Sequence, residues 1–499
     1  MKPRLWSAGI AHWMRWAAFV LLALLGLALR LPQLGARPMH TDEAVNAYIV
    51  GQLLTGEPYT YDAHDRHGPA LAAIALPLVR MQGAKTFSDL TESELRLTTV
   101  LTGTITIVLF GAAQEMFGFA PCVIAALLFA CAPLPVYYGR YFIHESLFVA
   151  ATFGLIVSGW SLLKKQSAWK AVLVGFCAAL MLAGKETAVL HFFALAVAAL
   201  AYWLWNLRGK TFGDWWRPKT ALTAIAVFLL LSVVLFTWFG SNWKAFGALF
   251  ETVPNELVRA GGEGHQKPVW YYLLLLSGGW SGGMALLLAC IGCFIATRKR
   301  HRSPLGFLAF YALFIAVIYS VIPYKTPWLA LNFMLPIALF TGVAIQSLWR
   351  MPAKYPALRI AAPAGCILLG CVSAALIAHD TRERVFVHSS DETNPYAYAH
   401  TSEDLLGLPA EIEELAQQNS IAAPRIAVIA SDPWPLPWYL RRYSNVGFWQ
   451  PGQQPGKADF YVTSTEAADQ YRSQLQDFRP EFFGVRPGVL IVLWSPAPK

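Results

Sequence analysis

Long apolar segments without charged residues are the feature that most constrains the fold of this chain. A helix that crosses a bilayer needs about 20 apolar residues, and such segments recur over the first three quarters of the 499 residues. Only 14% of the residues are charged, against roughly 25% in soluble domains. The sequence therefore predicts a polytopic, mainly α-helical membrane protein. The clearest segments are Thr220–Trp243, Pro268–Thr297, Ser303–Tyr324, Thr326–Trp349 and Ile360–Ala378.

Basic residues gather in short loops at alternate ends of the predicted spans, which is the positive-inside pattern. The pattern predicts a plasma (inner) membrane protein with a cytoplasmic N-terminus. With about 11 spans, the C-terminal region then lies outside. The net charge of +9 follows from this topology, so a nucleic-acid partner is not expected. The basic groups are Lys2, Arg4 and Arg15; Lys164, Lys165 and Lys170; Arg208, Lys210, Arg217 and Lys219; residues 298–302; and Arg350, Lys354 and Arg359.

The first spans enclose a long polar loop. Trp16–Leu34 is predicted to be a retained span and not a cleaved signal peptide, because a helical pattern resumes directly after it. Pro69–Val79 is apolar but too short to span, so we expect a juxtamembrane or re-entrant helix. It lies within an external loop over residues 37–94, and Leu95–Met116 follows as the second span.

The composition changes near residue 380, which predicts a boundary between a membrane domain (1–380) and an external α/β domain (381–499). An acid-rich amphipathic helix is indicated over Glu403–Gln418. The seven cysteines lie in or beside apolar segments, so no disulfide framework is expected in the C-terminal domain. Short buried strands separated by Pro and Gly turns are predicted at Arg425–Ala430, Asp459–Thr463 and Gly488–Trp494.

Five polar clusters lie on the predicted external side, and together they contain acids, cations and histidines. Charged groups this close to hydrocarbon are costly unless they are paired or face a wet cavity. Their convergence on one side of the bilayer therefore favours an active site. The clusters cover residues 40–43, 59–68, 136–145, 184–187, and the pair 264–267 with 323–327.

Each cluster also has a purely structural interpretation. Thr41 could cap a helix whose first turn carries Asp42 and Glu43. Arg140 and Glu145 could form a structural ion pair.

The remaining clusters have similar alternatives. The lysines at 185 and 325 could extend their ammonium groups to the membrane interface. His64 and His67, together with Asp62 and Asp65, have the residue types of a metal site, but their spacing is unspecific.

Six motifs, in the same order along the chain, resemble those of the GT-C glycosyltransferases. Within this superfamily the chain most resembles a prokaryotic branch, the flippase-activity-associated group, whose members are similar to an archaeal N-glycosylation protein. The wider superfamily includes protein mannosyltransferases and the aminoarabinose transferase of lipid A. The segment DPWPLPWYLRR (432–442) resembles the C-terminal domain of that branch. The six motifs are HTDEAVNAY (40–48), YDAHDRHG (61–68), YYGRYFIHE (137–145), AGKET (183–187), KPVWYY (267–272) and YKTPWL (324–329).

The resemblance implies a membrane helical bundle that transfers a sugar from a polyprenyl-phosphate donor with inversion. Asp42 matches the first-loop general base, with Glu43 beside it, and Glu145 matches the second-loop acidic position. Many relatives have an aspartate where this chain has His144 and Glu145, so the second-loop role stays open between these two. The implied substrate-binding groups are His67, Arg140, His144, Lys185, His265, Lys267 and Lys325.

Other properties remain open at this stage. The acceptor could be a glycan, a lipid or a protein. Some superfamily members bind a divalent cation and others do not, so the resemblance leaves a metal undecided. The alternative functions are a flippase or transport component for lipid-linked glycans, and a non-catalytic cell-envelope assembly protein. A transporter would be expected to carry polar groups at mid-span, and a scaffold would leave Asp42 and Glu145 without a common cavity.

The predicted topology can be tested with reporter fusions. Fusions at Lys210 and Lys299 are expected to report a cytoplasmic location, because both residues lie within basic loops. Fusions at Gly262 and after Lys499 are expected to report an external location. An external signal at Lys299 would contradict both the topology and the common external face.

Overall fold

The structure, a computed structural model, describes residues 11–63, 66–206, 217–259, 261, 264–298, 303–353 and 355–496. These residues form two compact units, each assembled from three stretches of the chain. The first unit contains the described parts of Met1–Pro32, Pro58–Ile74 and Arg96–Val387. The second contains those of Gln33–Glu57, Ala75–Leu95 and His388–Lys499.

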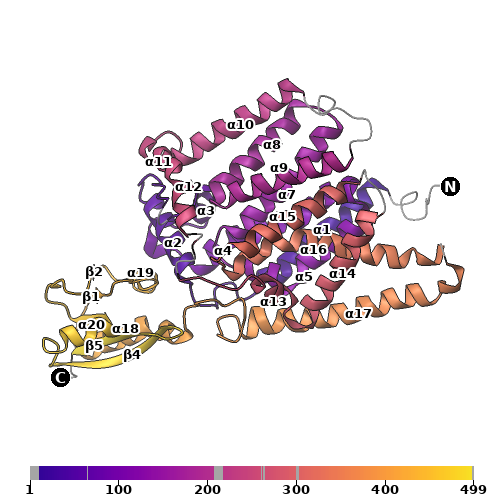
Figure 1. Ribbon diagram of the computed structural model, residues 1–499. Coiled ribbons are helices and arrows are strands. Elements are labelled where there is room, and N and C mark those ends of the chain that lie inside the picture. The colour runs from indigo at the N-terminus through magenta and orange to yellow at the C-terminus, as the bar shows by residue number, and fades with distance from the viewer. Residues whose placement is uncertain are drawn as a thin grey trace. The chain divides into compact units, whose positions relative to one another are not determined.

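The first unit is a bundle of apolar helices (Figure 1). Within the described residues, nine helices are long and apolar enough to cross a membrane, and three apolar helices are shorter. This confirms the predicted class, a mainly helical membrane bundle. Helices α3 (Ala70–Met81) and α4 (Glu92–Phe117) each have residues in both units. The other helices of the first unit are α1 (His12–Arg30), α5 (Phe119–Cys131), α6 (Pro133–Tyr138), α7 (Glu145–Lys164), α8 (Ala168–Gly184), α9 (Ala188–Trp205), α10 (Pro218–Phe236), α11 (Trp243–Ala248), α12 (Thr252–Arg259), α13 (Tyr271–Ser277), α14 (Gly279–Arg298), α15 (Pro304–Val321), α16 (Leu331–Trp349) and α17 (Ala361–Thr381).

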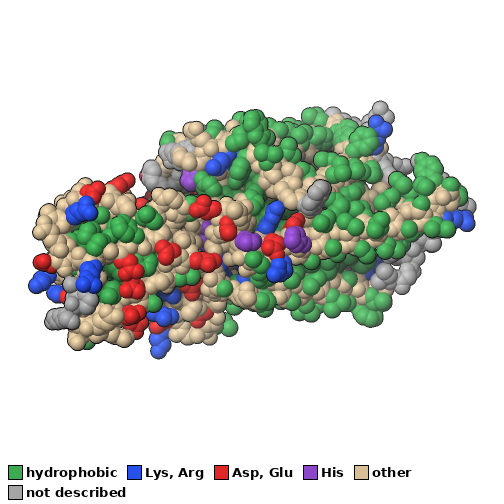
Figure 2. Space-filling view, turned by 90° about the horizontal axis from the view of Figure 1, so that it is seen from below, with side chains coloured by type: hydrophobic (Ala, Val, Ile, Leu, Met, Phe, Trp, Pro, Cys, Tyr) green, Lys and Arg blue, Asp and Glu red, His purple; other side chains and the backbone are tan. Residues whose placement is uncertain are grey.

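Helix α16 is the core of this bundle. It packs against α5, α7, α14, α15 and α17, and 94% of its span is buried, against 11% for α10 and α17. The outer helices expose large apolar side chains, such as Leu230 and Leu368. Figure 2 shows hydrophobic side chains over much of the visible surface of the helical unit. An apolar surface of this extent is stable in lipid and not in water.

Glycines allow the closest helix contacts around α16. A Cβ on Gly292 of α14 would lie 1.8 Å from the carbonyl oxygen of Phe340 in α16. A Cβ on Gly342 of α16 would lie 2.6 Å from the carbonyl oxygen of Pro121 in α5. Helix pairs in membranes approach closely at small residues, because packing replaces the hydrophobic effect as the source of association.

Arg30, the last residue of α1, donates hydrogen bonds to backbone carbonyl groups of two other helices. The chain breaks between α5 and α6, which leaves carbonyl groups at the end of α5 without helical partners. The buried Arg30 guanidinium donates to the carbonyl oxygens of Phe129 (2.7 Å), Ala130 (3.1 Å) and Pro135 (3.2 Å). A charged side chain therefore satisfies backbone groups that water cannot reach.

Two predicted spans differ from the structure. Within Thr220–Trp243 the helix ends at Phe236, and a turn with positive φ at Trp238 and Phe239 follows. The segment Pro268–Thr297 was expected to be continuous, but the structure divides it into α13 and α14. The break lies at Gly278 and Gly279, and Gly279 has a φ of 75°, which side-chain-bearing residues rarely adopt. The apolar run alone carried no signal for this turn.

The second unit contains a five-stranded sheet with helices α2 (Thr41–Leu54), α18 (Leu408–Gln418), α19 (Leu436–Tyr439) and α20 (Thr465–Tyr471). The strand order is β2-β1-β3-β5-β4. Strand β1 pairs in parallel with β2 and β3, while β5 pairs antiparallel with β3 and β4. The strands are β1 (Arg425–Ile429), β2 (Asn445–Trp449), β3 (Phe460–Ser464), β4 (Phe478–Arg486) and β5 (Val489–Pro496).

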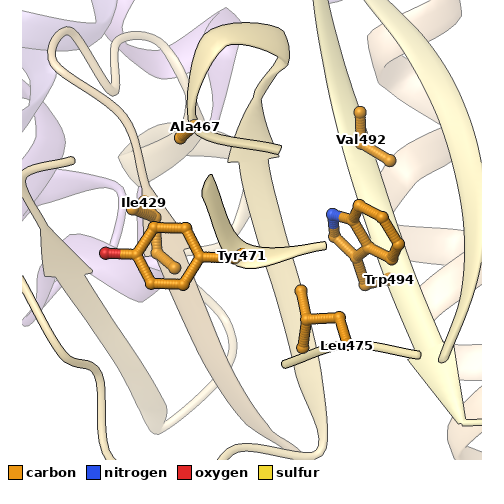
Figure 3. Packing of buried hydrophobic residues seen from close by; sticks show 6 residues of the cluster. All are labelled: Ile429, Ala467, Tyr471, Leu475, Val492 and Trp494. Carbon is orange, nitrogen blue, oxygen red and sulfur yellow. The ribbon is translucent and has the colours of Figure 1, made fainter. Parts of the chain in front are cut away.

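Figure 3 shows part of the core of this sheet domain. The buried cluster joins strands β1 and β5 to helix α20 and the turn after it, and consists of Ile429, Ala467, Tyr471, Leu475, Val492 and Trp494. Inside it, the Trp494 indole N–H donates to the Thr463 hydroxyl at 3.0 Å. The predicted α/β class of the C-terminal region is therefore confirmed.

The close approach of α14 to α16 gives a stability prediction. Gly292→Ala is expected to destabilise the protein by about 1–3 kcal/mol, because the new methyl group collides with backbone that cannot move alone. Gly283→Ala is the matched control, since a Cβ there meets its nearest atom at an ordinary 3.5 Å. Thermal unfolding in detergent measures both variants. Equal midpoints for the two variants would contradict the close-packing argument.

Candidate active site

The predicted acidic pair lies in the first turn of α2, in the second unit. The helix begins at Thr41, and His40, not Thr41, is the capping residue. The His40 Nδ1 accepts a hydrogen bond from the Asp42 backbone N–H at 3.0 Å. In return, the Glu43 carboxylate accepts from the His40 backbone N–H at 3.2 Å. This reciprocal arrangement is a capping box in which histidine takes the place of the usual serine or threonine.

Asp42 and Glu43 have different environments despite being adjacent. The Glu43 side chain is fully buried, and its Oε1 lies 3.8 Å from Nη2 of Arg37. The Asp42 side chain is 46% exposed. Glu43 therefore holds the helix start together, while Asp42 remains accessible to a substrate.

The second acidic position lies in the first unit, at the start of α7. Glu145 and Lys185 form a buried ion pair. Lys185 directly follows α8, so the pair joins the beginning of one apolar helix to the end of the next. Burial alone would lower the pKa of Lys185, but the charge of Glu145 and their hydrogen bond raise it. Lys185 is therefore a permanent cation beside Glu145.

A second acid–base pair lies next to the first. The His67 Nδ1 and Glu186 Oε2 are 2.7 Å apart, with Glu186 buried and His67 36% exposed. The Tyr61 hydroxyl contacts Glu186 at 3.3 Å and Thr252 at 2.9 Å. The carboxylate thereby fixes the orientation of the His67 ring, which keeps one edge accessible.

His144 connects the two pairs. Its ring lies 5.0 Å from that of His67, and it directly precedes Glu145. Burial lowers the pKa of His144 well below its ordinary value, and the charges of His67 and Lys185 act in the same direction. His144 is therefore neutral, and its Nδ1 has no hydrogen-bond partner within the part of the chain that the structure describes.

The other predicted cations are held by carbonyl groups and an aromatic ring. The Arg140 guanidinium donates to the Pro32 carbonyl oxygen at 2.7 Å and lies 4.6 Å from the ring centre of Phe386. Glu145 forms an ion pair with Lys185, and an additional pair of Glu145 with Arg140 stays a structural alternative.

The fifth cluster is brought together by a short backbone bridge. Gln266 and Tyr324 form an isolated antiparallel bridge, which places His265 and Lys267 beside Lys325. The Lys325 ammonium is buried and donates to the carbonyl oxygens of Lys267 (3.2 Å) and Ile322. Burial lowers the pKa of Lys325.

The structure thus gathers four predicted residues, His67, His144, Glu145 and Lys185, at the ends of α7 and α8. It places Asp42 and Glu43 in the other unit. Sequence reasoning missed the roles of Arg37, Tyr61 and Glu186, although Tyr61 and Glu186 lie in two of the motifs.

The candidate metal site at residues 62–67 lies only partly within the described residues. His64 and Asp65 lie outside the described residues. Among the residues that are described, no group of three or more His, Cys, Asp or Glu side chains is arranged to hold a metal ion.

Two solved structures share the fold of this chain over most of its length. ArnT from Cupriavidus metallidurans, solved bound to undecaprenyl phosphate, gives a TM-score of 0.65 at 15% identity, covering 95% of this chain and 97% of that one. The archaeal oligosaccharyltransferase AglB from Archaeoglobus fulgidus, solved with an inhibitory peptide and a dolichol-phosphate, gives 0.57 at 12% identity, covering 98% and 74%. This chain therefore shares the fold of these two proteins, which agrees with the resemblance seen in its motifs.

Sequence comparisons agree with the structural ones over part of the chain. Residues 74–238 match the family described as dolichyl-phosphate-mannose-protein mannosyltransferase. The undecaprenyl phosphate-alpha-4-amino-4-deoxy-L-arabinose arabinosyl transferase of Pseudomonas paraeruginosa is 30% identical over 161 residues. That match covers 30% of this chain and 26% of the relative, so this chain matches about a quarter of the relative's length.

The His67–Glu186 pair makes stability depend on pH. Burial disfavours both charged forms, but their mutual attraction raises the pKa of His67 above 6.5 and lowers that of Glu186 below 4.5. The stability from His67 is present below pH 6.5 and is lost as the pH rises through the raised pKa. The stability from Glu186 is present above pH 4.5 and is lost as the pH falls through the lowered pKa.

We therefore expect Glu186→Gln to lower the unfolding midpoint most between pH 4.5 and 6.5, and less as the pH rises further. Thermal unfolding in detergent over a pH series measures this. Glu115→Gln, at an exposed position of α4, is the control and should show no such pH dependence. A deficit that stays constant from about pH 5 to pH 8 would contradict the ion pair.

Proposed function

We propose that this protein is an integral membrane glycosyltransferase that moves a sugar from a polyprenyl-phosphate donor to an acceptor on the external face of the membrane. The fold is shared with a transferase structure that holds undecaprenyl phosphate. Both sequence relatives are transferases whose printed names contain a polyprenyl phosphate. The positive-inside pattern of the basic loops supports the external face.

The observation that carries the proposal is the unequal environment of the acidic pair. The buried carboxylate of Glu43 accepts the hydrogen bond of the capping box and lies beside the Arg37 guanidinium. Asp42 stands at the same helix N-terminus with its side chain 46% exposed. A general base must reach the proton that it removes, and the greater exposure of Asp42 supports Asp42 as this base.

The proposed reaction needs one base and little acid assistance. Asp42 removes the proton from an acceptor hydroxyl as that oxygen attacks the anomeric carbon of the donor. The bond between this carbon and the phosphate oxygen breaks, and the electron pair leaves with the polyprenyl phosphate. Because attack occurs opposite the leaving group, the configuration of the anomeric carbon inverts.

Neutralising the departing phosphate is the main task of the first unit under this proposal. Lys185 is the best-supported cation, because Glu145 keeps it charged at the end of α8. A phosphate approaching Lys185 would share the ammonium with Glu145, and His67 would add a second donor held in place by Glu186. Preorganised donors of this kind stabilise developing charge without reorganising during the reaction.

The remaining predicted cations have supporting parts in this proposal. The carbonyl contacts of Arg140 and Lys325 hold these two side chains in place, and the backbone bridge keeps His265 and Lys267 beside Lys325. The neutral His144 is suited to accept a hydrogen bond from a sugar or acceptor hydroxyl. Glu145 acts mainly by keeping Lys185 charged and oriented.

The test is sugar transfer by membranes that contain Asp42→Asn. The amide has the shape of the carboxylate but cannot accept the proton, so transfer from labelled polyprenyl-phosphate sugars should fall by about 10²-fold or more. Thin-layer chromatography or mass spectrometry of the lipid and the product measures it. Expression and thermal stability are expected to stay close to those of the unaltered protein.

Glu43→Gln is the matched control, since it changes the neighbouring carboxylate. It should mainly reduce thermal stability, by about 1–3 kcal/mol, because it weakens a buried hydrogen-bonded group. Full transfer by Asp42→Asn, together with loss of transfer in a stably folded Glu43→Gln variant, would assign the base to Glu43. Donor lipids that cross the bilayer with the sugar–phosphate bond intact would instead indicate a transport function.

A further inference from the structure

The backbone just before the acidic pair is held on both sides by side chains from the C-terminal domain. The Met39 N–H donates to the Tyr439 hydroxyl at 2.8 Å. The Met39 carbonyl oxygen accepts from the Thr401 hydroxyl at 2.7 Å. All three residues are buried, so water does not replace either hydrogen bond.

The next residue along the chain continues this contact. The His40 ring packs edge-on against that of His400, with ring centres 5.5 Å apart. His40 in turn accepts the hydrogen bond from the Asp42 backbone N–H. Three contacts from residues 400, 401 and 439 therefore hold residues 39 and 40, and the His40 cap connects these to the backbone of Asp42.

Two further contacts hold the C-terminal end of the same polar loop, at residues 90–92. The buried Trp438 indole donates to the Glu92 carboxylate at 2.8 Å, and Arg441 donates to the Leu90 carbonyl oxygen at 3.0 Å. The Arg441 guanidinium also lies 3.6 Å from the Trp438 ring centre. The segment DPWPLPWYLRR thus holds residues both before and after α2. Its Trp438 and Tyr439 side chains make two of these contacts.

We infer that the C-terminal domain positions the proposed catalytic base, with Tyr439 and Thr401 acting as positioning residues for Asp42. The inference rests on the proposed function. A half-exposed carboxylate has little around its own side chain to fix it, so its place depends on the backbone that carries it. The clamp on Met39, formed by Tyr439 and Thr401, and the His40 cap set that backbone.

The physical basis is the steep dependence of reactivity on geometry. A base displaced by about 1 Å can lose up to 100-fold in rate, whereas donor binding by the cations of the first unit does not use the clamp residues. The clamp should therefore affect kcat and leave the KM for the donor nearly unchanged. A merely structural contact would instead lower the amount of folded protein without changing the kcat of what remains.

The experiment compares Tyr439→Phe, Thr401→Val and the double variant with Tyr443→Phe. Tyr443 is a matched control, because its hydroxyl donates to the Pro409 carbonyl oxygen at 2.7 Å within the C-terminal domain. Two measurements are made on the full-length protein in detergent or membranes. The first is kcat and donor KM with a labelled polyprenyl-phosphate sugar, and the second is hydrogen exchange of peptides covering residues 39–43.

We expect the double variant to lose about 10- to 100-fold in kcat, with donor KM within about twofold. Peptides covering residues 39–43 should exchange faster than in the unaltered protein, and Tyr443→Phe should change neither quantity. Normal kcat and unchanged exchange in the double variant, while Asp42→Asn is inactive, would overturn the positioning role and leave the proposed function standing.

The two measurements separate the failure of each idea. If the unaltered protein transfers no sugar from any donor, the proposed function fails, and the positioning role fails with it. Faster exchange in the clamp variants would then identify the contact as structural only. Faster exchange with normal kcat in an active enzyme would likewise overturn the positioning role.

Discussion

The cost of a charge beside hydrocarbon is the constraint on which the polar parts of the first unit depend. Lys185 is paired with Glu145, and Glu186 with His67. Arg30 instead uses backbone carbonyl groups that a helix break leaves open. Each pairing lowers the cost of burying a charge and also fixes the side chain in one orientation. The charged groups are therefore already oriented before a substrate binds.

Much of the fold follows from the sequence, because spans and buried strands leave long or alternating apolar patterns. Three strands were predicted close to their observed bounds. Strands β2 and β4 were missed because they lie at the two edges of the sheet, where exposed residues interrupt the apolar pattern and Pro480 and Glu481 are tolerated. The break at Gly278 was missed for the converse reason, since glycine fits an apolar run equally well as a packing residue or as a turn.

The candidate site was predictable as a set of motifs but not as a set of contacts. The sequence indicates that Asp42 and Glu43 share a helix start, yet neighbouring carboxylates look alike until burial separates them. Histidine as a cap was not anticipated, because serine, threonine, aspartate and asparagine are the usual capping residues. The pairing of Lys185 with Glu145 brings together two helix ends that are 40 residues apart in the chain. No local sequence pattern predicts such a pairing.

The clamp on Met39 joins residues that are far apart in the chain, and this has a consequence for folding during synthesis. Met39 and Tyr439 are 400 residues apart in the chain, and a ribosome adds about 5–20 residues per second. The acidic loop therefore waits about 20–80 s after its own synthesis before the residues that hold it exist. During that interval the membrane helices can insert and pack while the loop is still unfixed. Synthesis and folding of the segment that carries Thr401 and Tyr439, and not membrane insertion, is then the step at which Asp42 takes up its final place.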